Sequence, residues 1–130
     1  MNNPPLILIV DDEENFRDIF SSELKAVGYA VETAQNGEDG FKVAKESKPD
    51  LILMDMEMPI LNGAEAVMKL KNDPETAQIK VVFLTNYGDP RREMTEADVH
   101  FSKEIGAVDY LRKTDDMEEI VTRIKSRIQV

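Results

Sequence analysis

The sequence predicts an α/β fold in which an open, doubly wound parallel sheet of five strands is covered by five helices. Short aliphatic runs alternate with amphipathic stretches from residue 6 to the end of the chain, and the connections between them are short. This alternation favours a parallel sheet with helices on both faces, and right-handed crossovers then make it doubly wound. The 130 residues suffice for one domain with one core. We expect residues 1–5 to be a disordered lead and residues 6–130 to form that domain.

The first four elements follow from the spacing of apolar residues. Residues 6–10 are a continuous aliphatic run, which is typical of a strand buried on both faces. Residues 12–27 carry apolar side chains at helical spacing and are followed by Gly28, a residue type that commonly ends a helix. A short strand is expected over residues 29–33. Residues 37–46 predict a weak helix, because a glycine lies inside it.

The later elements repeat the same alternation. The final helix is predicted to begin near Asp115, where Glu118 could complete a capping box. The polar stretch over residues 88–104 is expected to hold a loop and a helix. We expect the other elements to be strands over residues 51–54, 81–84 and 108–111 and a helix over residues 64–71.

Composition excludes several classes of function. The chain has 26 acidic and 16 basic residues and a net charge of −10, which argues against general affinity for nucleic acid or an anionic membrane. Cysteine is absent, which excludes disulfides, zinc–thiolate sites and cysteine nucleophiles. The apolar runs are too short to span a bilayer, and the first residues do not read as a signal peptide. We therefore expect a cytoplasmic protein.

Polar side chains follow four of the predicted strands. Asp11 and Asp12 follow the first strand, Asp55 ends the run over 51–54, Thr85 ends the run over 81–84, and the last strand leads to Lys113. Because the ligand site of a doubly wound sheet lies beyond the carboxyl ends of its strands, these side chains should meet in one crevice.

Three carboxylates in one crevice would repel one another, and a divalent cation relieves that repulsion. Mg²⁺ prefers hard oxygen ligands and readily accepts a phosphoryl oxygen. Each residue alone has an ordinary explanation, since acids in a first helical turn stabilise the helix and a lone lysine is usually a solvated charge. The arrival of all of them at one sheet edge favours a site for Mg²⁺ and a phosphoryl group.

These residues and their spacing resemble the response-regulator receiver domains of bacterial two-component signalling. The resemblance covers residues 6–128 and implies a flavodoxin-like receiver fold with strand order 2-1-3-4-5. The matching segments are residues 9–12 (IVDD), 49–59 (PDLILMDMEMP), 62–63 (NG), 84–85 (LT) and 106–113 (GAVDYLRK).

The resemblance implies that Asp55 is the phosphoacceptor. It implies that Mg²⁺ is bound by Asp12, by Asp55 and by the backbone carbonyl of Glu57, with Asp11 acting through a water molecule. The sequence departs from the family at Thr114, where a proline is usual, and in the extra length between Thr85 and Lys113.

The resemblance also implies a switch. Thr85 and Lys113 would contact the phosphoryl group, and Thr85 and Tyr110 would change position together. The expected donor is a histidine kinase or a phosphotransfer protein, and the expected target is a protein that binds the face made by the fourth helix, the last strand and the last helix. We expect no nucleic-acid or membrane partner, and a monomer or weak homodimer.

The predicted function is that of a stand-alone phosphoacceptor, not an enzyme beyond Mg²⁺-dependent self-phosphotransfer and autodephosphorylation. One alternative is a haloacid-dehalogenase-like phosphatase with Asp55 as its nucleophile, although the expected Gly-Thr and a cap domain are missing. Another is a flavodoxin-like redox carrier, which the acidic run after the first strand disfavours because it would repel a phosphate.

Overall fold

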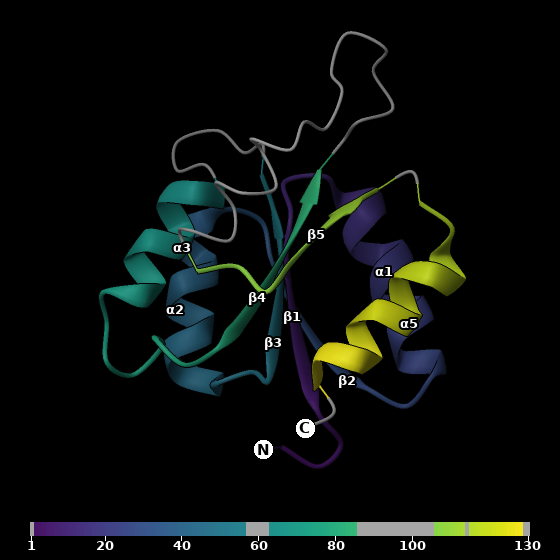
Figure 1. Cartoon of the computed structure of the whole chain (residues 1–130), viewed down its shortest axis with the longest axis horizontal. Coiled ribbons are helices and arrows are strands. Elements are labelled where there is room, and N and C mark those ends of the chain that lie inside the picture. The colour runs from purple at the N-terminus through teal and green to yellow at the C-terminus, as the bar shows by residue number, and fades with distance from the viewer. Residues whose placement is uncertain (1, 57–62, 86–105, 114, 129–130) are drawn as a thin grey trace, which may run out of the picture.

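Five strands form one parallel sheet in the order β2-β1-β3-β4-β5 (Figure 1). The computed structural model describes residues 2–56, 63–85, 106–113 and 115–128. The described elements are β1 (Leu6–Val10), α1 (Glu14–Ala26), β2 (Ala30–Ala34), α2 (Gly37–Ser47), β3 (Leu51–Asp55), α3 (Gly63–Lys71), β4 (Lys80–Thr85), β5 (Asp109–Arg112) and α5 (Met117–Ile128). The predicted strand order and doubly wound architecture are confirmed.

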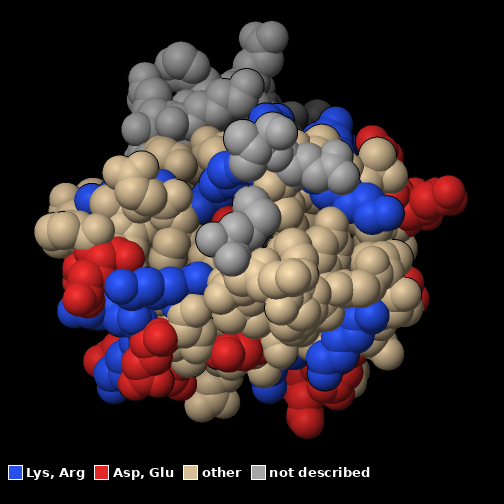
Figure 2. All heavy atoms as spheres, turned by 90° about the horizontal axis from the view of Figure 1, so that it is seen from below, with Lys and Arg blue, Asp and Glu red and all other residues tan. Residues whose placement is uncertain are grey.

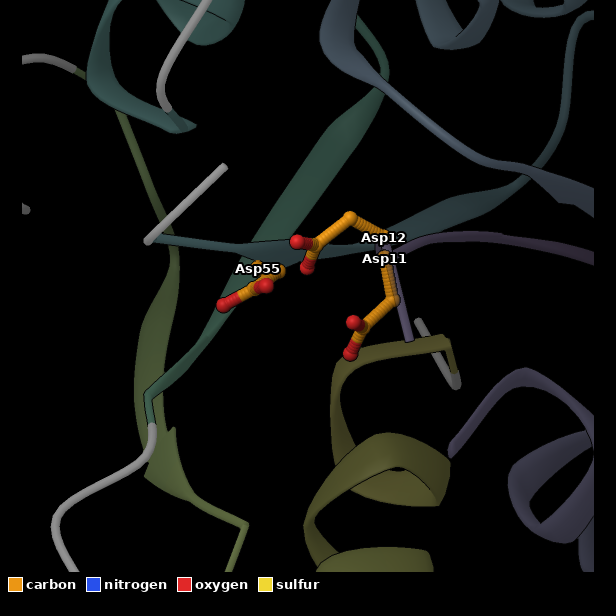
Figure 3. Close-up of side chains that lie close together, drawn as sticks. All are labelled: Asp11, Asp12 and Asp55. Carbon is orange, nitrogen blue, oxygen red and sulfur yellow. The ribbon is translucent and has the colours of Figure 1, made fainter. Parts of the chain in front are cut away.

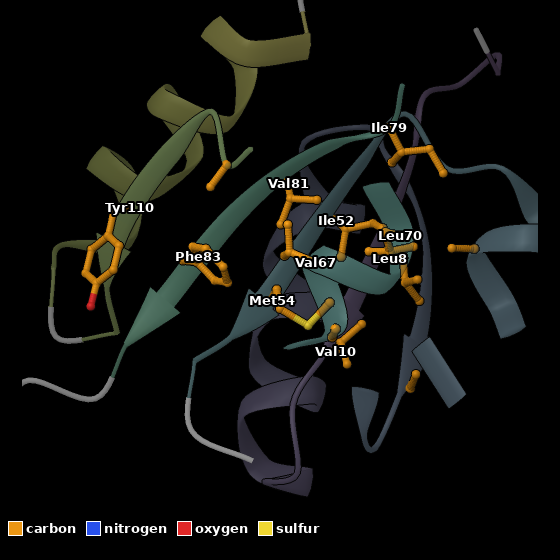
Figure 4. Close-up of a cluster of buried hydrophobic side chains, with 14 residues drawn as sticks. Leu8, Val10, Ile52, Met54, Val67, Leu70, Ile79, Val81, Phe83 and Tyr110 are labelled. Atoms are coloured by element: carbon orange, nitrogen blue, oxygen red, sulfur yellow. The ribbon is translucent and has the colours of Figure 1, made fainter. Parts of the chain in front are cut away.

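Helices cover both faces of the sheet, with α2 and α3 on one side and α1 and α5 on the other (Figure 1). Successive strand side chains point to opposite faces, so β1 contributes alternately to two cores. Leu8 and Val10 pack with α2 and α3 (Figure 4), whereas Ile7 and Ile9 pack with α1 and α5. Strands buried on both faces explain why the sequence shows continuous aliphatic runs instead of alternation.

The end of α1 follows the predicted glycine signal. Gly28 has a φ of 103°, a conformation that residues with a Cβ rarely adopt. Its N–H donates to Lys25 O at 3.0 Å, and the N–H of Tyr29 donates to Leu24 O at 3.1 Å. This pair of hydrogen bonds is a Schellman motif, which turns the chain into β2.

The start of α5 differs from the prediction by one residue. The helix begins at Met117, and the side chain of Asp116 accepts a hydrogen bond from the Glu118 N–H at 3.2 Å. Asp115 instead accepts from the Arg112 N–H at 3.1 Å and closes the turn after β5. Because Asp115 is engaged in the turn after β5, Asp116 takes the place expected for Asp115 at the start of the helix.

Two further expectations have partial answers. The helix expected within residues 88–104 lies outside the described residues. Asn2 donates from its side chain to Lys48 O and Asp50, while the disorder expected for residues 1–5 stays a prediction.

None of the helices in the described part of the chain is long and apolar enough to cross a membrane. On the face shown in Figure 2, acidic and basic side chains lie interspersed around an uncharged centre.

Gly63 sets how closely α3 approaches the end of β3. A Cβ added at Gly63 would lie 2.5 Å from Asp55 O and 2.8 Å from the Met56 Cα, both backbone atoms that cannot move alone. We therefore expect Gly63→Ala to lower the free energy of unfolding by about 2–3 kcal/mol. Urea denaturation would measure this change. Met68→Ala, at a half-exposed position of the same helix, should change it by less than about 0.5 kcal/mol, and equal effects would contradict the expectation.

Candidate functional site

Three carboxylates meet beyond the carboxyl ends of β1 and β3. Oxygen atoms of Asp11, Asp12 and Asp55 all lie within 4.8 Å of one another, and their carboxyl groups face a common space (Figure 3). Asp11 and Asp55 are buried, with 0% and 2% of their surface exposed, whereas Asp12 is exposed. The crevice predicted from the strand ends is present, and it opens to solvent on the side of Asp12.

Hydrogen bonds fix the chain around Asp11. Its N–H donates to Ala34 O at 3.1 Å, which continues the β1–β2 pairing by one residue. Its side-chain Oδ1 accepts from the Glu13 N–H at 2.9 Å, and its carbonyl accepts from the Arg17 guanidinium at 2.7 Å. One oxygen of the Asp11 carboxylate is thus committed to the backbone, while Oδ2 faces the cluster.

Lys113 brings a cation to the cluster from the end of β5. Its N–H donates to Thr85 O at 2.8 Å, so β4 sets the position of its backbone. Its Nζ lies 2.6 Å from Asp11 Oδ2 and 3.6 Å from both Asp55 Oδ2 and Glu13 Oε1. The side chain is only 1% exposed. Of the side chains that the structure describes, four thus converge as predicted, namely Asp11, Asp12, Asp55 and Lys113.

Crowding of the carboxylates perturbs the titration of the site. Burial and the charge of Asp11 raise the pKa of Asp55 to about 8, and Lys113 offsets this only in part. Burial alone would lower the pKa of Lys113, but the carboxylates of Asp11 and Asp55 outweigh it and raise that pKa. The cluster therefore holds more negative charge than one ammonium can compensate.

The donor set fits a hard divalent cation. Three carboxylates from two strand ends provide the oxygen ligands that Mg²⁺ prefers, with an open side for water or a phosphoryl oxygen. Asp11 Oδ2 and Lys113 Nζ form a buried ion pair at 2.6 Å, and neither atom has a further hydrogen-bond partner among the described residues. The described residues form an acidic pocket that could bind a metal.

The raised pKa of Asp55 predicts how the stability of the metal-free protein depends on pH. Its folded-state pKa exceeds the unfolded value of about 3.9, so it contributes stability that is complete near pH 4 and is lost as the pH rises to about 8. Lys113 titrates above this window. In EDTA we expect the free energy of unfolding to fall by about 3 kcal/mol between pH 5.5 and 8.5.

Urea denaturation at a series of pH values would measure that fall. Asp55→Asn removes the titrating group and should flatten the curve. Parallel curves for the wild type and Asp55→Asn would show that Asp55 does not titrate in this window.

Of the two residues expected to act as a switch, Thr85 adjoins the site through its carbonyl, which accepts from the Lys113 N–H, and Tyr110 lies in the neighbouring strand β5. Thr85 ends β4 and is 1% exposed, and Tyr110 in β5 is 6% exposed. The Tyr110 ring packs edge-on against Phe83, with centroids 6.2 Å apart. Tyr110 is the residue of β5 that belongs to the core cluster drawn in Figure 4, and it lies at one edge of that cluster.

Some expected site residues cannot be placed. Glu57 and Thr114 lie outside the described residues, so the carbonyl ligand and the bond after Lys113 stay predictions. Sequence reasoning missed two neighbours of Lys113, which are Glu13 and the ring of Phe16. Both residues follow Asp12 closely in the sequence, and this proximity was the available signal. Phe16 was interpreted only as part of the apolar face of a helix.

Comparison with known proteins agrees with the site. Residues 7–125 match the family of response regulator receiver domains. PilH of Pseudomonas aeruginosa is 38% identical over 120 residues, which cover 92% of this chain and 94% of PilH. The transcriptional regulator RpaA of Synechocystis is 34% identical over 125 residues, which cover 96% of this chain but 49% of RpaA. The chain thus spans about half the length of some curated relatives that it matches and nearly all of another.

Solved structures support the same assignment. The chemotaxis protein CheY4 of Vibrio cholerae superposes with a TM-score of 0.84 at 26% identity, covering 94% of this chain and 97% of CheY4. A response regulator of Chloroflexus aurantiacus has a TM-score of 0.84 at 28% identity, covering 97% and 99%. None of these findings supports the phosphatase alternative. The chain belongs to the response regulator receiver domains, the phosphoacceptor signalling domains of two-component systems.

Proposed function

We propose that Asp55 is the residue that accepts the phosphoryl group. The observation that carries this proposal is the position of Asp55, which is buried at a strand end with Lys113 Nζ 3.6 Å away and two further carboxylates within 4.8 Å. No other carboxylate of the described cluster ends a strand at the centre of the sheet.

In the proposed step, an oxygen of the Asp55 carboxylate attacks the phosphorus of a phosphohistidine. A P–O bond forms as the P–N bond breaks, the imidazole leaves with the bonding electron pair, and an aspartyl phosphate remains. Lys113 would stabilise the negative charge on the phosphoryl oxygens, and positioning would provide most of the acceleration. Asp12, Asp55 and the backbone carbonyl of Glu57 would hold Mg²⁺, with Asp11 acting through a water molecule. The cation would supply the positive charge that this carboxylate cluster lacks.

Treatment with acetyl phosphate and MgCl₂ tests the proposal, because it requires no cognate kinase. Intact mass should increase by one phosphoryl group in the wild type. It should not increase in Asp55→Asn, which keeps the shape of the side chain. An adduct of the same yield in Asp55→Asn would place the acceptor at another residue.

The proposed partners are proteins. Family membership supports a histidine kinase or a phosphotransfer protein as donor and a second protein as target. We place the target on the face that includes β5 and α5, because β5 pairs with β4, which ends in Thr85, and leads directly to Lys113. The net charge of −10 supports the absence of a nucleic-acid partner.

The proposed switch couples Thr85 to Tyr110. A phosphoryl group brings about −1.5 to −2 charge, and the Thr85 hydroxyl can donate to one of its oxygens by moving toward Asp55. Space vacated beside Thr85 would then be open to the Tyr110 ring. The shift in population is limited by how much better a partner binds one arrangement than the other.

Amide hydrogen exchange with and without beryllofluoride measures this switch. Protection in the wild type should change in β5, and Thr85→Ala should bind beryllofluoride but lose most of the change in β5. Changes confined to the residues directly after Asp55 and Thr85 would contradict the proposed coupling.

A further inference from the structure

The ammonium of Lys113 lies against the face of an aromatic ring. Its Nζ is 4.3 Å from the centroid of Phe16, within the range of a cation–π interaction. Phe16 belongs to the first turn of α1, directly after the acidic run. Residues 11–16 therefore bring to this lysine the carboxylates of Asp11 and Glu13 together with an aromatic ring. The ion pairs of Lys113 Nζ at the site are all with carboxylates, and the ring adds an uncharged contact.

Packing fixes the Phe16 ring in this position. It stacks on Phe20, with centroids 5.7 Å apart and ring planes 23° from parallel. Phe20 is 1% exposed in the core between the sheet and the helices α1 and α5, and Phe16 packs against the same cluster. Core packing therefore holds the ring in place, and Lys113 Nζ lies over its face.

The other described contacts of the Lys113 ammonium are ion pairs with carboxylates. The nearest is a buried ion pair with Asp11 Oδ2 at 2.6 Å, whereas the contacts with Asp55 and Glu13 at 3.6 Å are too long for hydrogen bonds. Glu13 is about half exposed, so solvent screens its attraction for the ammonium. Ion pairing thus holds the ammonium close to Asp11, and a further contact can set how near it stays to Asp55.

We propose that Phe16 is a positioning residue for Lys113, whose ring face holds the ammonium in the crevice beside Asp55. A ring attracts a cation without an acceptor lone pair, so the N–H groups of Lys113 remain available to phosphoryl oxygens. The ring also carries no net charge, so the cation keeps its attraction for a dianionic phosphoryl group. This inference rests on the proposed function of Asp55 and Lys113.

The first test needs neither Mg²⁺ nor phosphoryl donor. In protein with ¹³Cε-labelled lysine, the Hε protons of Lys113 should resonate upfield, because they lie near the shielding face of the Phe16 ring. Lys113→Arg identifies the signal by its loss. In Phe16→Leu the signal should move downfield to the position of exposed lysines, and an unchanged position would overturn the contact.

The second test separates the charge distribution of the ring from its shape. Phe16 is replaced by 4-fluoro-, 3,4-difluoro- and 3,4,5-trifluorophenylalanine, which progressively weaken the attraction of the ring face for a cation with little change in size. The rate of phosphorylation by acetyl phosphate should fall stepwise, by about three- to thirtyfold in the trifluoro variant. A purely structural role would leave this series flat.

Two controls make the outcomes distinct. Ile19→Ala, at a half-exposed position of α1, should keep the wild-type rate, and thermal unfolding of each variant checks its fold. A phosphorylated wild type together with a trifluoro variant of equal rate would overturn the role of Phe16 alone. A wild type that gains no phosphoryl group would overturn the proposed function, and the positioning role with it, even where the upfield signal is present.

Discussion

Lys113→Met is expected to slow phosphorylation of Asp55 by about 10²- to 10³-fold, the usual effect of removing one group that stabilises developing negative charge. The reason lies in the geometry, because Lys113 Nζ is 3.6 Å from Asp55 Oδ2 and is the one cation among the described side chains of the cluster. Methionine keeps the length of the aliphatic stem and removes the charge. Intact mass against time with acetyl phosphate and saturating MgCl₂ would measure the rate.

Two variants serve as controls for this result. Lys113→Arg keeps the charge in another shape and should recover part of the rate. Lys80→Met removes a lysine at the opposite end of the sheet, where its Nζ donates to Arg127 O, and should leave the rate unchanged. A Lys113→Met protein that is phosphorylated at the wild-type rate would remove Lys113 from the proposed mechanism.

Much of the fold could be predicted because both faces of the sheet are covered. A strand buried on both sides needs apolar residues at every position, so β1, β3 and β4 are visible as aliphatic runs. Boundaries were less predictable, since β2 runs over Ala30–Ala34 and not over 29–33. Its register is set by pairing with β1, where Ala30 lies opposite Leu6, and that long-range pairing leaves no signal in the local sequence.

The location of the site was predictable for a related reason. Residues that directly follow parallel strands must meet at one edge, so Asp11, Asp55 and Lys113 could be placed together without knowing a side-chain conformation. Their contacts could not be ranked in this way. Lys113 Nζ lies 2.6 Å from Asp11, 3.6 Å from Asp55 and over the Phe16 ring. These distances depend on side-chain rotamers, which are set by packing.

Asp12→Ala is expected to weaken Mg²⁺ binding by at least about tenfold while leaving the fold intact, because a small, hard cation depends on each of its few carboxylate ligands. Asp12 is exposed, and both its hydrogen bond and its charge help to raise the pKa of Asp55. Its loss should therefore relieve repulsion and leave the metal-free protein equally stable or slightly more stable at pH 8. Calorimetric titration with MgCl₂ and urea denaturation in EDTA would measure the two effects.

Asp11→Ala is the informative comparison, because the side chain of Asp11 also makes contacts that stabilise the fold. Asp11 also accepts from the Glu13 N–H and pairs with the buried Lys113, so its loss should lower the free energy of unfolding by about 3 kcal/mol as well as weaken Mg²⁺ binding. Asp18→Ala, at an exposed acid of α1, should change neither quantity. If Asp12→Ala kept the wild-type affinity for Mg²⁺, Asp12 would not be a ligand, and the cation would have to be held by the buried carboxylates of Asp11 and Asp55.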